Sequence, residues 1–282
     1  HVLVEALPYI RRFAGKTVVV KFGGNAIAGT SDHDALSLFA EDIVLMHTVG
    51  IRPVVVHGGG PQIDAALLSA GIESQSIGGF RVTTPKIFEI VQSVLAGEVC
   101  ASLVSNLRKA GVNAAGISGR DGNTLQGIRM TKIVDGTPAE LGLVGEVTKV
   151  DTEMIESLLE EKFTPVISPL ANEISADNGL NVNADLAAAA IAGGLKAESL
   201  IVLTDVSGIY RNYPDPTSII SEISATELAM MKNDFQGGMA PKVAACLAAI
   251  AAGAIAVRII DGNSAESLLL ALAGNGGTLV HA

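Results

Sequence analysis

The chain has 282 residues, enough for one large α/β domain or for two lobes, and its net charge of −10 comes without a run of basic residues. This balance argues against a nucleic acid or an anionic membrane as partner, because both attract basic surfaces. Nearly half of the residues (49%) are apolar but only 4% are aromatic, so we expect a core of Ala, Val, Ile and Leu, as in helices packed on a parallel sheet.

The cysteines indicate neither a disulfide framework nor a metal site. Cys100 and Cys246 are the only two, they lie far apart in the sequence, and both fall in apolar helical patterns that suit a core. No segment has the pattern of a secretion signal, and no apolar run looks long enough to cross a bilayer. We therefore expect a cytoplasmic protein.

Residues 1–16 precede the alternation of strands and helices that makes up the rest of the chain. Leu3, Leu7, Ile10 and Phe13 stand at helical spacing there. Such a helix either packs on the core of its own chain or buries its apolar face on another subunit. The spacing leaves both possibilities open.

The first predicted strand, residues 17–20, is a run of β-branched residues without alternation, which favours a strand buried on both faces. Lys21 ends the strand, and Gly23 and Gly24 follow. Open α/β sheets bind ligands at the carboxyl ends of their strands, and paired glycines let a backbone approach an anion closely. Taken alone, the segment could equally be a solvated strand-end cation and a simple turn.

A second predicted strand, residues 53–57, ends in three consecutive glycines, Gly58 to Gly60, followed by Pro61. A glycine-rich turn that leads into a helix presents backbone N–H groups to an anion, and proline suits the first helical turn. We interpret this segment as a binding site for a phosphate or carboxylate, with a plain tight turn as the alternative.

Two further polar features are candidates for the site. Arg81 lies in a short hairpin predicted for residues 76–84, where it could form a bidentate pair with a carboxylate or remain a solvated edge residue. Asn181, Asn183 and Asp185 precede an alanine-rich helix, and Asp185 falls in its first turn. A carboxylate there can act simply as a partner of the helix dipole, but the density of polar residues favours a functional role.

Near the end of the chain, Gly237, Gly238, Pro241 and Lys242 open a second long alanine-rich helix. A glycine pair and a lysine at a helix N-terminus again favour an anion. The sequence thus predicts two lysines, Lys21 and Lys242, that each lie close to a glycine-rich turn.

Strands and helices alternate on both sides of residues 193–194, where the composition shifts. We predict an α/β fold, a three-layer α/β/α sandwich on a mainly parallel open sheet. Residues 17–194 would form an N-terminal lobe and residues 195–282 a C-terminal lobe.

Two cations, glycine-rich turns and an aspartate that holds the lysines suit phosphoryl transfer. That reaction requires mainly positioning of the reactants and compensation of the charge on the transferred group. We expect Mg²⁺, if present, to be bound through the phosphates of a nucleotide rather than by a set of protein ligands. The predicted chemistry rests chiefly on Lys21, Asp185 and Lys242.

Seven motifs in the sequence resemble those of the amino acid kinase family, and within it those of the acetylglutamate kinases. They occur in family order and cover nearly the whole chain. The motifs are Lys21-Phe-Gly-Gly-Asn, Val-Val-Val-His57-Gly-Gly-Gly-Pro-Gln, Gly79-Phe-Arg-Val-Thr, Gly-Ile-Ser118-Gly-Arg-Asp-Gly, Asn181-Val-Asn-Ala-Asp, Leu-Thr204-Asp-Val-Ser-Gly-Ile-Tyr and Gly-Met239-Ala-Pro-Lys.

The resemblance implies transfer of the ATP γ-phosphate to the side-chain carboxylate of N-acetyl-L-glutamate, a step of arginine biosynthesis. It implies that the N-terminal lobe binds acetylglutamate and the C-terminal lobe binds ATP with Mg²⁺. By matched position, the catalytic residues are Lys21, Lys242, Asp185 and Gly24. The residues implied to bind acetylglutamate are Gly59, Gly60, Arg81 and Asn181, and those implied to bind the nucleotide are Asp205, Val206, Ser207, Gly208, Tyr210, Gly238 and Met239.

The N-terminal segment resembles the extra helix of the arginine-inhibited branch of the family, which implies a hexamer built as a trimer of dimers. The C-terminus departs from that branch. Glu266 stands where the branch has histidine, Ala271 stands where it has glutamate, and the following glycine loop is shorter. We therefore expect arginine inhibition to be weak, altered or absent.

Two alternatives belong beside this interpretation. One is a kinase of the same family that acts on a related acid, such as an aminoadipate-, aspartate- or carbamate-type substrate. The other is a non-catalytic module that binds ATP or senses an amino acid. The latter would be expected to lack Lys21, Asp185 or Lys242, and all three are present.

Overall fold

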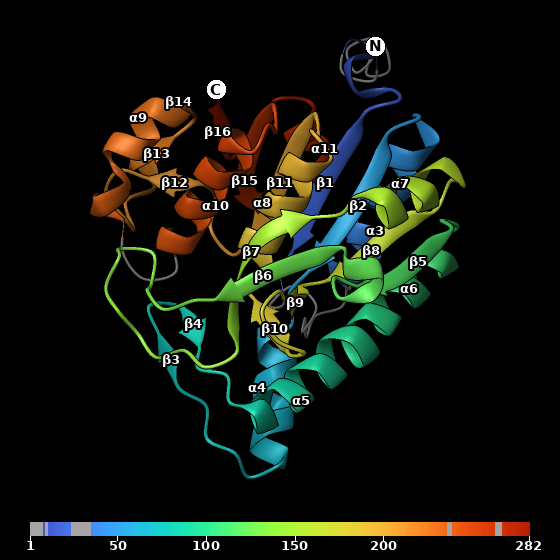
Figure 1. Ribbon diagram of the computed structural model, residues 1–282. Coiled ribbons are helices and arrows are strands. Elements are labelled where there is room, and N and C mark those ends of the chain that lie inside the picture. The colour runs from blue at the N-terminus through green and yellow to red at the C-terminus, as the bar shows by residue number, and fades with distance from the viewer. Residues whose placement is uncertain (1–7, 9–10, 24–34, 236–238, 263–266) are drawn as a thin grey trace.

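The computed structural model describes residues 8, 11–23, 35–235, 239–262 and 267–282 (Figure 1). Leu3, Leu7 and Ile10 of the expected N-terminal helix lie outside these ranges. Gly24, Gly238 and Glu266 also lie outside the described residues. Their expected roles therefore stay predictions.

An eight-stranded open sheet runs through the centre of the molecule (Figure 1). Its order is β14-β16-β15-β11-β1-β2-β8-β5, and neighbouring strands are parallel except for the antiparallel pair of β15 and β16. The mainly parallel sheet predicted from the sequence is confirmed. The strands are β1 (Thr17–Phe22), β2 (Arg52–His57), β5 (Ala114–Ser118), β8 (Thr164–Ser168), β11 (Ser199–Thr204), β14 (Glu222–Ser224), β15 (Ala256–Asp261) and β16 (Thr278–His281).

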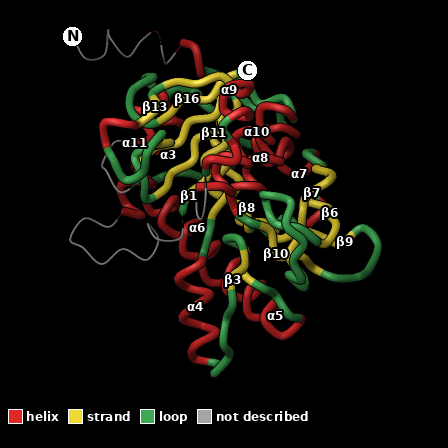
Figure 2. The backbone as a smooth tube through the Cα atoms, turned by 90° about the vertical axis from the view of Figure 1, so that its left-hand side faces the viewer, coloured by secondary structure: helices red, strands yellow, loops and turns green. Residues whose placement is uncertain are grey.

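Helices cover both faces of this sheet, which confirms the three-layer architecture. Figure 2 shows the strands between two groups of helices. On one face α3 and α6 pack against the strands of the first half and α11 against β11 and β15; on the other lie α7, α8 and α10. The helices are α3 (Ala35–Thr48), α4 (Gly60–Ser69), α5 (Pro85–Gln92), α6 (Cys100–Lys109), α7 (Glu153–Glu160), α8 (Ala184–Gly194), α9 (Ala225–Met230), α10 (Met239–Ala251) and α11 (Ser267–Leu272).

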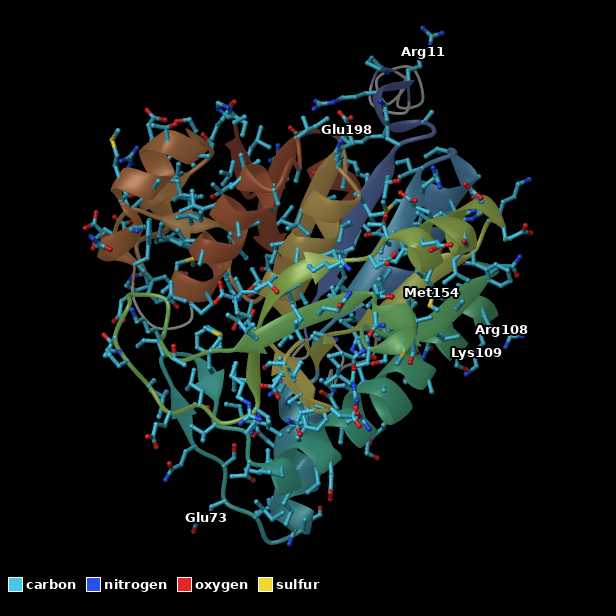
Figure 3. The ribbon with its side chains drawn as sticks, in the orientation of Figure 1. Arg11, Glu73, Arg108, Lys109, Met154 and Glu198 are labelled. Carbon is cyan, nitrogen blue, oxygen red and sulfur yellow. The ribbon has the colours of Figure 1, made fainter. Side chains whose placement is uncertain are left out.

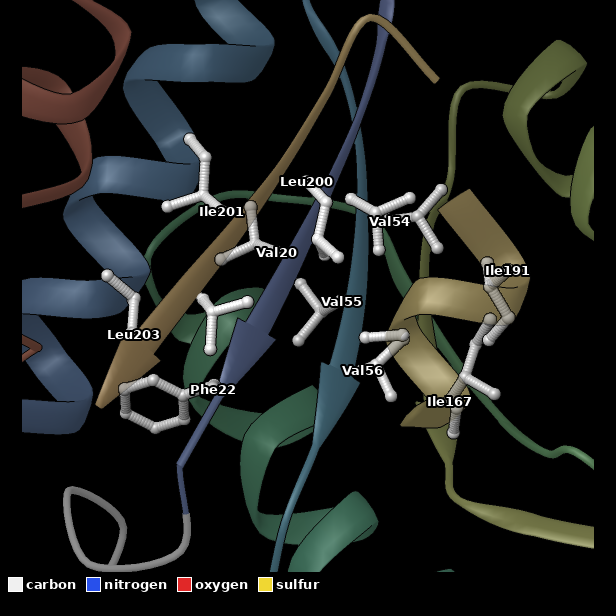
Figure 4. Close-up of a cluster of buried hydrophobic side chains, with 14 of the residues drawn as sticks. Val20, Phe22, Val54, Val55, Val56, Ile167, Ile191, Leu200, Ile201 and Leu203 are labelled. Carbon is white, nitrogen blue, oxygen red and sulfur yellow. The ribbon is translucent and has the colours of Figure 1, made fainter. Parts of the chain in front are cut away.

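The core lies around the middle strands β1, β2 and β11, where both faces are covered. Val20, Val55 and Leu200 are at most 1% exposed, and Figure 4 shows their side chains among those of neighbouring strands and of α8. Continuous aliphatic runs form such strands because no position has to face water. Cys100 and Cys246 are free thiols buried in the same core, as expected.

A helical stretch of 25 residues, Pro85–Lys109, combines α5, a π-helical segment η1 (Ser93–Val99) and α6. Its length and hydropathy alone would suffice to cross a bilayer, a criterion that buried core helices also meet. The stretch instead packs against α3, α4, β5 and β8 as part of the globular fold. The π-helical segment was not predicted, because no local sequence pattern distinguishes it from an α-helix.

Four strands between residues 125 and 182 form a second, smaller sheet that closes into a barrel. β6 and β7 pair antiparallel, and β9 and β10 close the barrel, which the sequence did not predict. Two short hairpins, β3–β4 and β12–β13, lie outside both sheets. The strands are β6 (Leu125–Arg129), β7 (Val144–Val150), β9 (Leu170–Glu173), β10 (Gly179–Val182), β3 (Ser76–Ile77), β4 (Phe80–Arg81), β12 (Ile209–Tyr210) and β13 (Ile219–Ile220), and the short 3₁₀ turns are η2 (Asp121–Asn123), η3 (Pro216–Ser218) and η4 (Lys232–Asp234).

Candidate active site

A cleft of about 290 Å³ opens at the carboxyl ends of β1, β2 and β11. The glycine loop (residues 58–60), the hairpin β3–β4 and the N-terminal turns of α8 and α10 complete its walls. Elements from both predicted lobes therefore contribute to one cavity. This is the edge of an open α/β sheet where ligands are expected to bind.

The centre of the cleft holds a lysine–aspartate cluster made of Lys21, Asp185 and Lys242. The Nζ atom of Lys21 lies 2.8 Å from Oδ1 of Asp185, and Nζ of Lys242 lies 3.3 Å from Oδ2. The side chains are only 9%, 6% and 16% exposed, in the order Lys21, Asp185 and Lys242. The three residues come from β1, α8 and α10, so the structure brings together groups that are far apart in the sequence, as predicted.

The charges within this cluster keep the carboxylate ionised. Burial by itself would raise the pKa of Asp185, but the ammonium groups of Lys21 and Lys242 outweigh burial and lower the pKa to about 2. One carboxylate faces two ammonium groups, so the cluster carries a net positive charge inside the cleft. A further anion, such as a phosphoryl group, would balance it.

The N-terminus of α8 fixes the position of Asp185. The side chain of Asn183 caps this helix, since its Oδ1 accepts hydrogen bonds from the backbone N–H groups of Asp185 (2.9 Å) and Leu186 (3.3 Å). The cap explains one of the three polar residues found ahead of the alanine-rich helix. Asn183 is therefore a structural member of that group.

Close packing of α8 against α10 brings Lys242 within reach of Asp185. A Cβ atom built on Gly193 of α8 would lie 2.2 Å from the Cβ of Ala252, which follows α10. Only glycine allows the two backbones to approach so closely. The small residues of both helices thus set the separation on which the cluster depends.

The glycine loop follows β2 and leads into α4, with Gly59 as the N-cap and Pro61 in the first turn. A Cβ atom on Gly59 would lie 2.6 Å from Cδ2 of the buried Leu95, whereas one on Gly60 would meet nothing within 4 Å. Gly59 is thus required by packing against η1. The loop and the N-terminus of α4 provide the backbone N–H groups expected of an anion site.

A buried polar network beneath this loop was not predicted. Nδ1 of His57 lies 2.9 Å from the carbonyl oxygen of Gly58, and Nε2 lies 3.0 Å from Oγ of Ser168. Since Nδ1 faces a carbonyl it donates, which leaves Nε2 as an acceptor. The hydroxyl of Ser168 also lies 3.2 Å from the carbonyl oxygen of Leu95, so its one hydrogen serves either that oxygen or Nε2. Burial lowers the pKa of His57 to about 4, only partly opposed by the hydrogen bond to Gly58, so the imidazole is neutral at pH 7.

Arg81 and Asn181 line the same cleft. Arg81 lies in β4 and forms an ion pair with Asp64 of α4, with 2.6 Å between Nη1 and Oδ1. Asn181 lies in β10, and its Nδ2 donates to Oγ1 of Thr83 at 3.0 Å. The four residues predicted to bind acetylglutamate, Gly59, Gly60, Arg81 and Asn181, therefore share one cavity.

The residues predicted to bind the nucleotide are less concentrated. Asp205 lines the cleft directly after β11, and its Oδ1 accepts from Oγ1 of Thr204 at 3.0 Å. Gly208 is held beside Thr278, whose Oγ1 would lie 2.7 Å from a Cβ at that position. Within the described ranges, five predicted residues are not part of the cleft lining: Val206, Ser207, Gly208, Tyr210 and Met239. Their assignment to the nucleotide stays a prediction.

The described part of the chain contains no group of three His, Cys, Asp or Glu side chains placed to hold a metal ion. The donor set that the cleft does offer, ammonium groups and backbone N–H groups, suits the phosphates of a nucleotide.

Residues 16–261 match the Amino acid kinase family, and the chain belongs to that family. Its similar relatives within the family are acetylglutamate kinases. That of Paenarthrobacter aurescens is 50% identical over 277 residues, which cover 95% of this chain and 87% of the relative. That of Streptomyces coelicolor is 46% identical over 270 residues, which cover 96% of this chain and 87% of the relative.

Solved structures share the fold. The N-acetylglutamate synthase from Neisseria gonorrhoeae has a TM-score of 0.83 and 28% identity; the match covers 99% of this chain and 62% of that longer chain. Carbamate kinase from Giardia lamblia bound to AMP-PNP has a TM-score of 0.68 and 22% identity, with 95% and 99% covered. The second likeness shows the fold alone.

Proposed function

We propose that this chain is an ATP-dependent kinase that phosphorylates the side-chain carboxylate of N-acetyl-L-glutamate, giving N-acetyl-L-glutamyl 5-phosphate for arginine biosynthesis in the cytoplasm. The observation that carries the proposal is the lysine–aspartate cluster, in which Lys21 and Lys242 both contact Asp185 at the centre of the cleft. Relatives with about half of their residues identical are acetylglutamate kinases, which supports the choice of substrate.

The reaction forms one bond and breaks one. An oxygen of the side-chain carboxylate attacks the γ-phosphorus of ATP, the bond from that phosphorus to the β,γ-bridging oxygen breaks, and ADP leaves with the electron pair. No proton has to be abstracted from an ionised carboxylate. The protein therefore contributes mainly position and positive charge.

Lys21 and Lys242 supply that charge. Their ammonium groups face the phosphoryl group and the bridging oxygen, where negative charge is spread in the transition state. Asp185 holds both lysines in place, because burial of its carboxylate makes contact with them strongly favourable. Bound Mg²⁺ would neutralise part of the charge of the nucleotide phosphates.

Acetylglutamate would lie against the N-terminal lobe, with its α-carboxylate at Arg81 and with Asn181, Gly59 and Gly60 around it. The presence of these four residues in one cavity supports this arrangement. The nucleotide would lie toward Asp205 and the start of α10. By resemblance, the amide of Gly24 would donate to the transferred phosphoryl group, and Gly238 and Met239 would contact ATP.

We also propose that the N-terminal helix assembles the chain into a hexamer, a trimer of dimers, and that arginine inhibits weakly or not at all. Support for the second point comes from the sequence at Glu266 and Ala271, where the residues of the arginine-inhibited branch are replaced. The molar mass from light scattering tests the hexamer, and the activity measured at increasing arginine concentrations tests the inhibition. A dimeric mass, or strong inhibition at low arginine, would contradict them.

The substrate is tested by measuring ADP release and hydroxamate formation with purified protein, Mg²⁺ and ATP. N-acetylglutamate, glutamate, aspartate, aminoadipate and carbamate are compared as acceptors. We expect turnover with N-acetylglutamate well above that with the other acids. Faster turnover with another acid would indicate that the protein is a related kinase of the same family. ATP binding without phosphoryl transfer to any of the acids would indicate a non-catalytic module.

A further inference from the structure

The side chain of Arg81 is fixed on one side by two residues that neither the sequence nor the resemblance singled out. Nη1 of Arg81 forms an ion pair with Oδ1 of Asp64 at 2.6 Å, and the same nitrogen donates a hydrogen bond to Oγ of Ser74. Asp64 lies in α4, directly after Ile63, which lines the cleft. Ser74 lies in the loop that joins α4 to the hairpin β3–β4.

The backbone of Arg81 is fixed independently. In the hairpin it pairs with Ser76, and its carbonyl oxygen accepts from Oγ1 of the buried Thr83 at 2.7 Å. Asp64 and Ser74 therefore have no part in holding the strand. They determine only where the guanidinium group points.

Both contacts of the guanidinium lie at one of its three nitrogens. Nη1 faces Asp64 in the ion pair and donates a hydrogen bond to Ser74. Nε and Nη2 have no hydrogen-bond acceptor among the described residues. These two nitrogens form the edge that matches a carboxylate with two parallel hydrogen bonds.

The solvent exposure of Asp64 and Arg81 indicates that their ion pair orients Arg81 without adding much to the stability of the fold. The side chain of Asp64 is 62% exposed while that of Arg81 is 14% exposed, so the acid lies on the solvent side and the base on the cleft side. Ion pairs with an exposed partner contribute little to the free energy of unfolding, because water screens them. The same screening weakens any repulsion between Asp64 and an anionic ligand.

We infer that Asp64 is a positioning residue for acetylglutamate binding. It holds Nη1 of Arg81, with help from Ser74, so that the Nε–Nη2 edge receives the α-carboxylate of the substrate. This inference rests on the proposed function. It adds the residue that makes Arg81 a preoriented carboxylate binder rather than a mobile cation at the rim of the cleft.

The test is a double-mutant cycle on kcat/KM for acetylglutamate with Asp64→Ala, Arg81→Ala and the double variant, each at saturating ATP. We expect Asp64→Ala to raise the KM for acetylglutamate about tenfold, with kcat and the KM for ATP within about twofold of wild type. Because Asp64 acts through Arg81, the double variant should match Arg81→Ala alone. The ratio kcat/KM is read from the initial slope where saturation is not reached.

Three further variants separate orientation from charge and folding. Asp64→Asn keeps an acceptor for Nη1 and should raise the KM by less than about threefold. Ser74→Ala removes the second acceptor and should raise the KM with kcat unchanged. Glu73→Ala makes the same change of net charge one residue from Ser74, on a side chain that points away from the molecule (Figure 3), and should leave all constants and the melting temperature unchanged.

An unchanged or lowered KM in Asp64→Ala would overturn the inference, since Asp64 would then be neutral or would compete with the substrate. Additive effects of Asp64→Ala and Arg81→Ala on kcat/KM would overturn it as well. Failure of the proposed function is a different result. In that case wild-type protein itself would not phosphorylate acetylglutamate.

Discussion

Lys21 and Asp185 form a contact of 2.8 Å between Nζ and Oδ1, with both side chains less than one-tenth exposed. The contact joins the carboxyl end of the central strand β1 to the first turn of α8, and the two residues are 164 positions apart in the sequence. Neither charge would be stable there alone, because an isolated buried charge is costly. The charges of Lys21, Asp185 and Lys242 therefore depend on one another. The cluster can be tested by measuring the free energy of unfolding as well as the activity.

The acid dependence of stability tests the charge on Asp185. Its pKa falls from the ordinary 3.8 to about 2, so the folded state binds a proton less readily than the unfolded chain. The corresponding stabilisation, about 2 kcal/mol, is complete above pH 4 and is lost as the pH falls toward 2. We expect Asp185→Asn to be less stable than wild type at pH 7 and the difference to narrow below pH 4.

Urea unfolding of both proteins between pH 2 and pH 7 measures this difference. A gap between wild type and Asp185→Asn that stays constant over the whole range would contradict the ionised carboxylate. At pH 7 the gap should be about 3–5 kcal/mol, because the variant leaves two ammonium groups in the cleft without their partner.

His57 is expected to titrate far below an ordinary histidine. Burial lowers its pKa from 6.5 to about 4, so the unfolded chain takes up this proton first as the pH falls. The neutral imidazole contributes its full share to the free energy of unfolding above pH 6.5, and about 3 kcal/mol of that free energy is lost as the pH falls to 4. The imidazole signals in NMR spectra, assigned with a His57→Gln variant, give the pKa directly. A midpoint between 6 and 7 would show that the imidazole is not enclosed.

The distance between α8 and α10, set near their C-terminal ends by Gly193 and Ala252, should affect the activity of the lysine–aspartate cluster at their N-terminal ends. Gly193→Ala would place a Cβ atom 2.2 Å from that of Ala252, so the helices must separate, at a cost of about 1–3 kcal/mol in the free energy of unfolding. We expect kcat to fall with it, because Lys242 moves away from Asp185.

The complementary change Ala252→Gly provides the control. It makes room for the new methyl group, so the double variant Gly193→Ala/Ala252→Gly should regain most of the melting temperature and of kcat. If the double variant remains as impaired as Gly193→Ala, the spacing between these helices is not what limits activity.

The parts of the fold that could be predicted are those with a local signal. The strand predicted for residues 53–57 is β2, which begins one residue earlier, because an aliphatic run between polar turns has few alternatives. Lys21, Asp185 and Lys242 could be grouped because the carboxyl ends of parallel strands and the first turns of the following helices meet at one edge.

The parts that were missed depend on contacts between distant segments. The hydrogen bond of His57 to Ser168 joins the ends of neighbouring strands β2 and β8, and strand order is not legible from one sequence. Asp64 lies on an exposed turn of α4, where an acidic residue is unremarkable until Arg81 is seen beside it. Closure of the small barrel likewise depends on pairings with no local signal.

Steady-state kinetics of Lys21→Ala and Lys242→Ala test the central claim most directly, with ATP and acetylglutamate both varied. Removing a charged donor that acts in the transition state costs about 3–4 kcal/mol, so each variant should lose about 10²–10³-fold in kcat. The KM values should change much less. Lys16→Ala, on a lysine near Glu198 and outside the cleft lining, should behave as wild type. An unchanged kcat in either Lys21→Ala or Lys242→Ala would contradict the account.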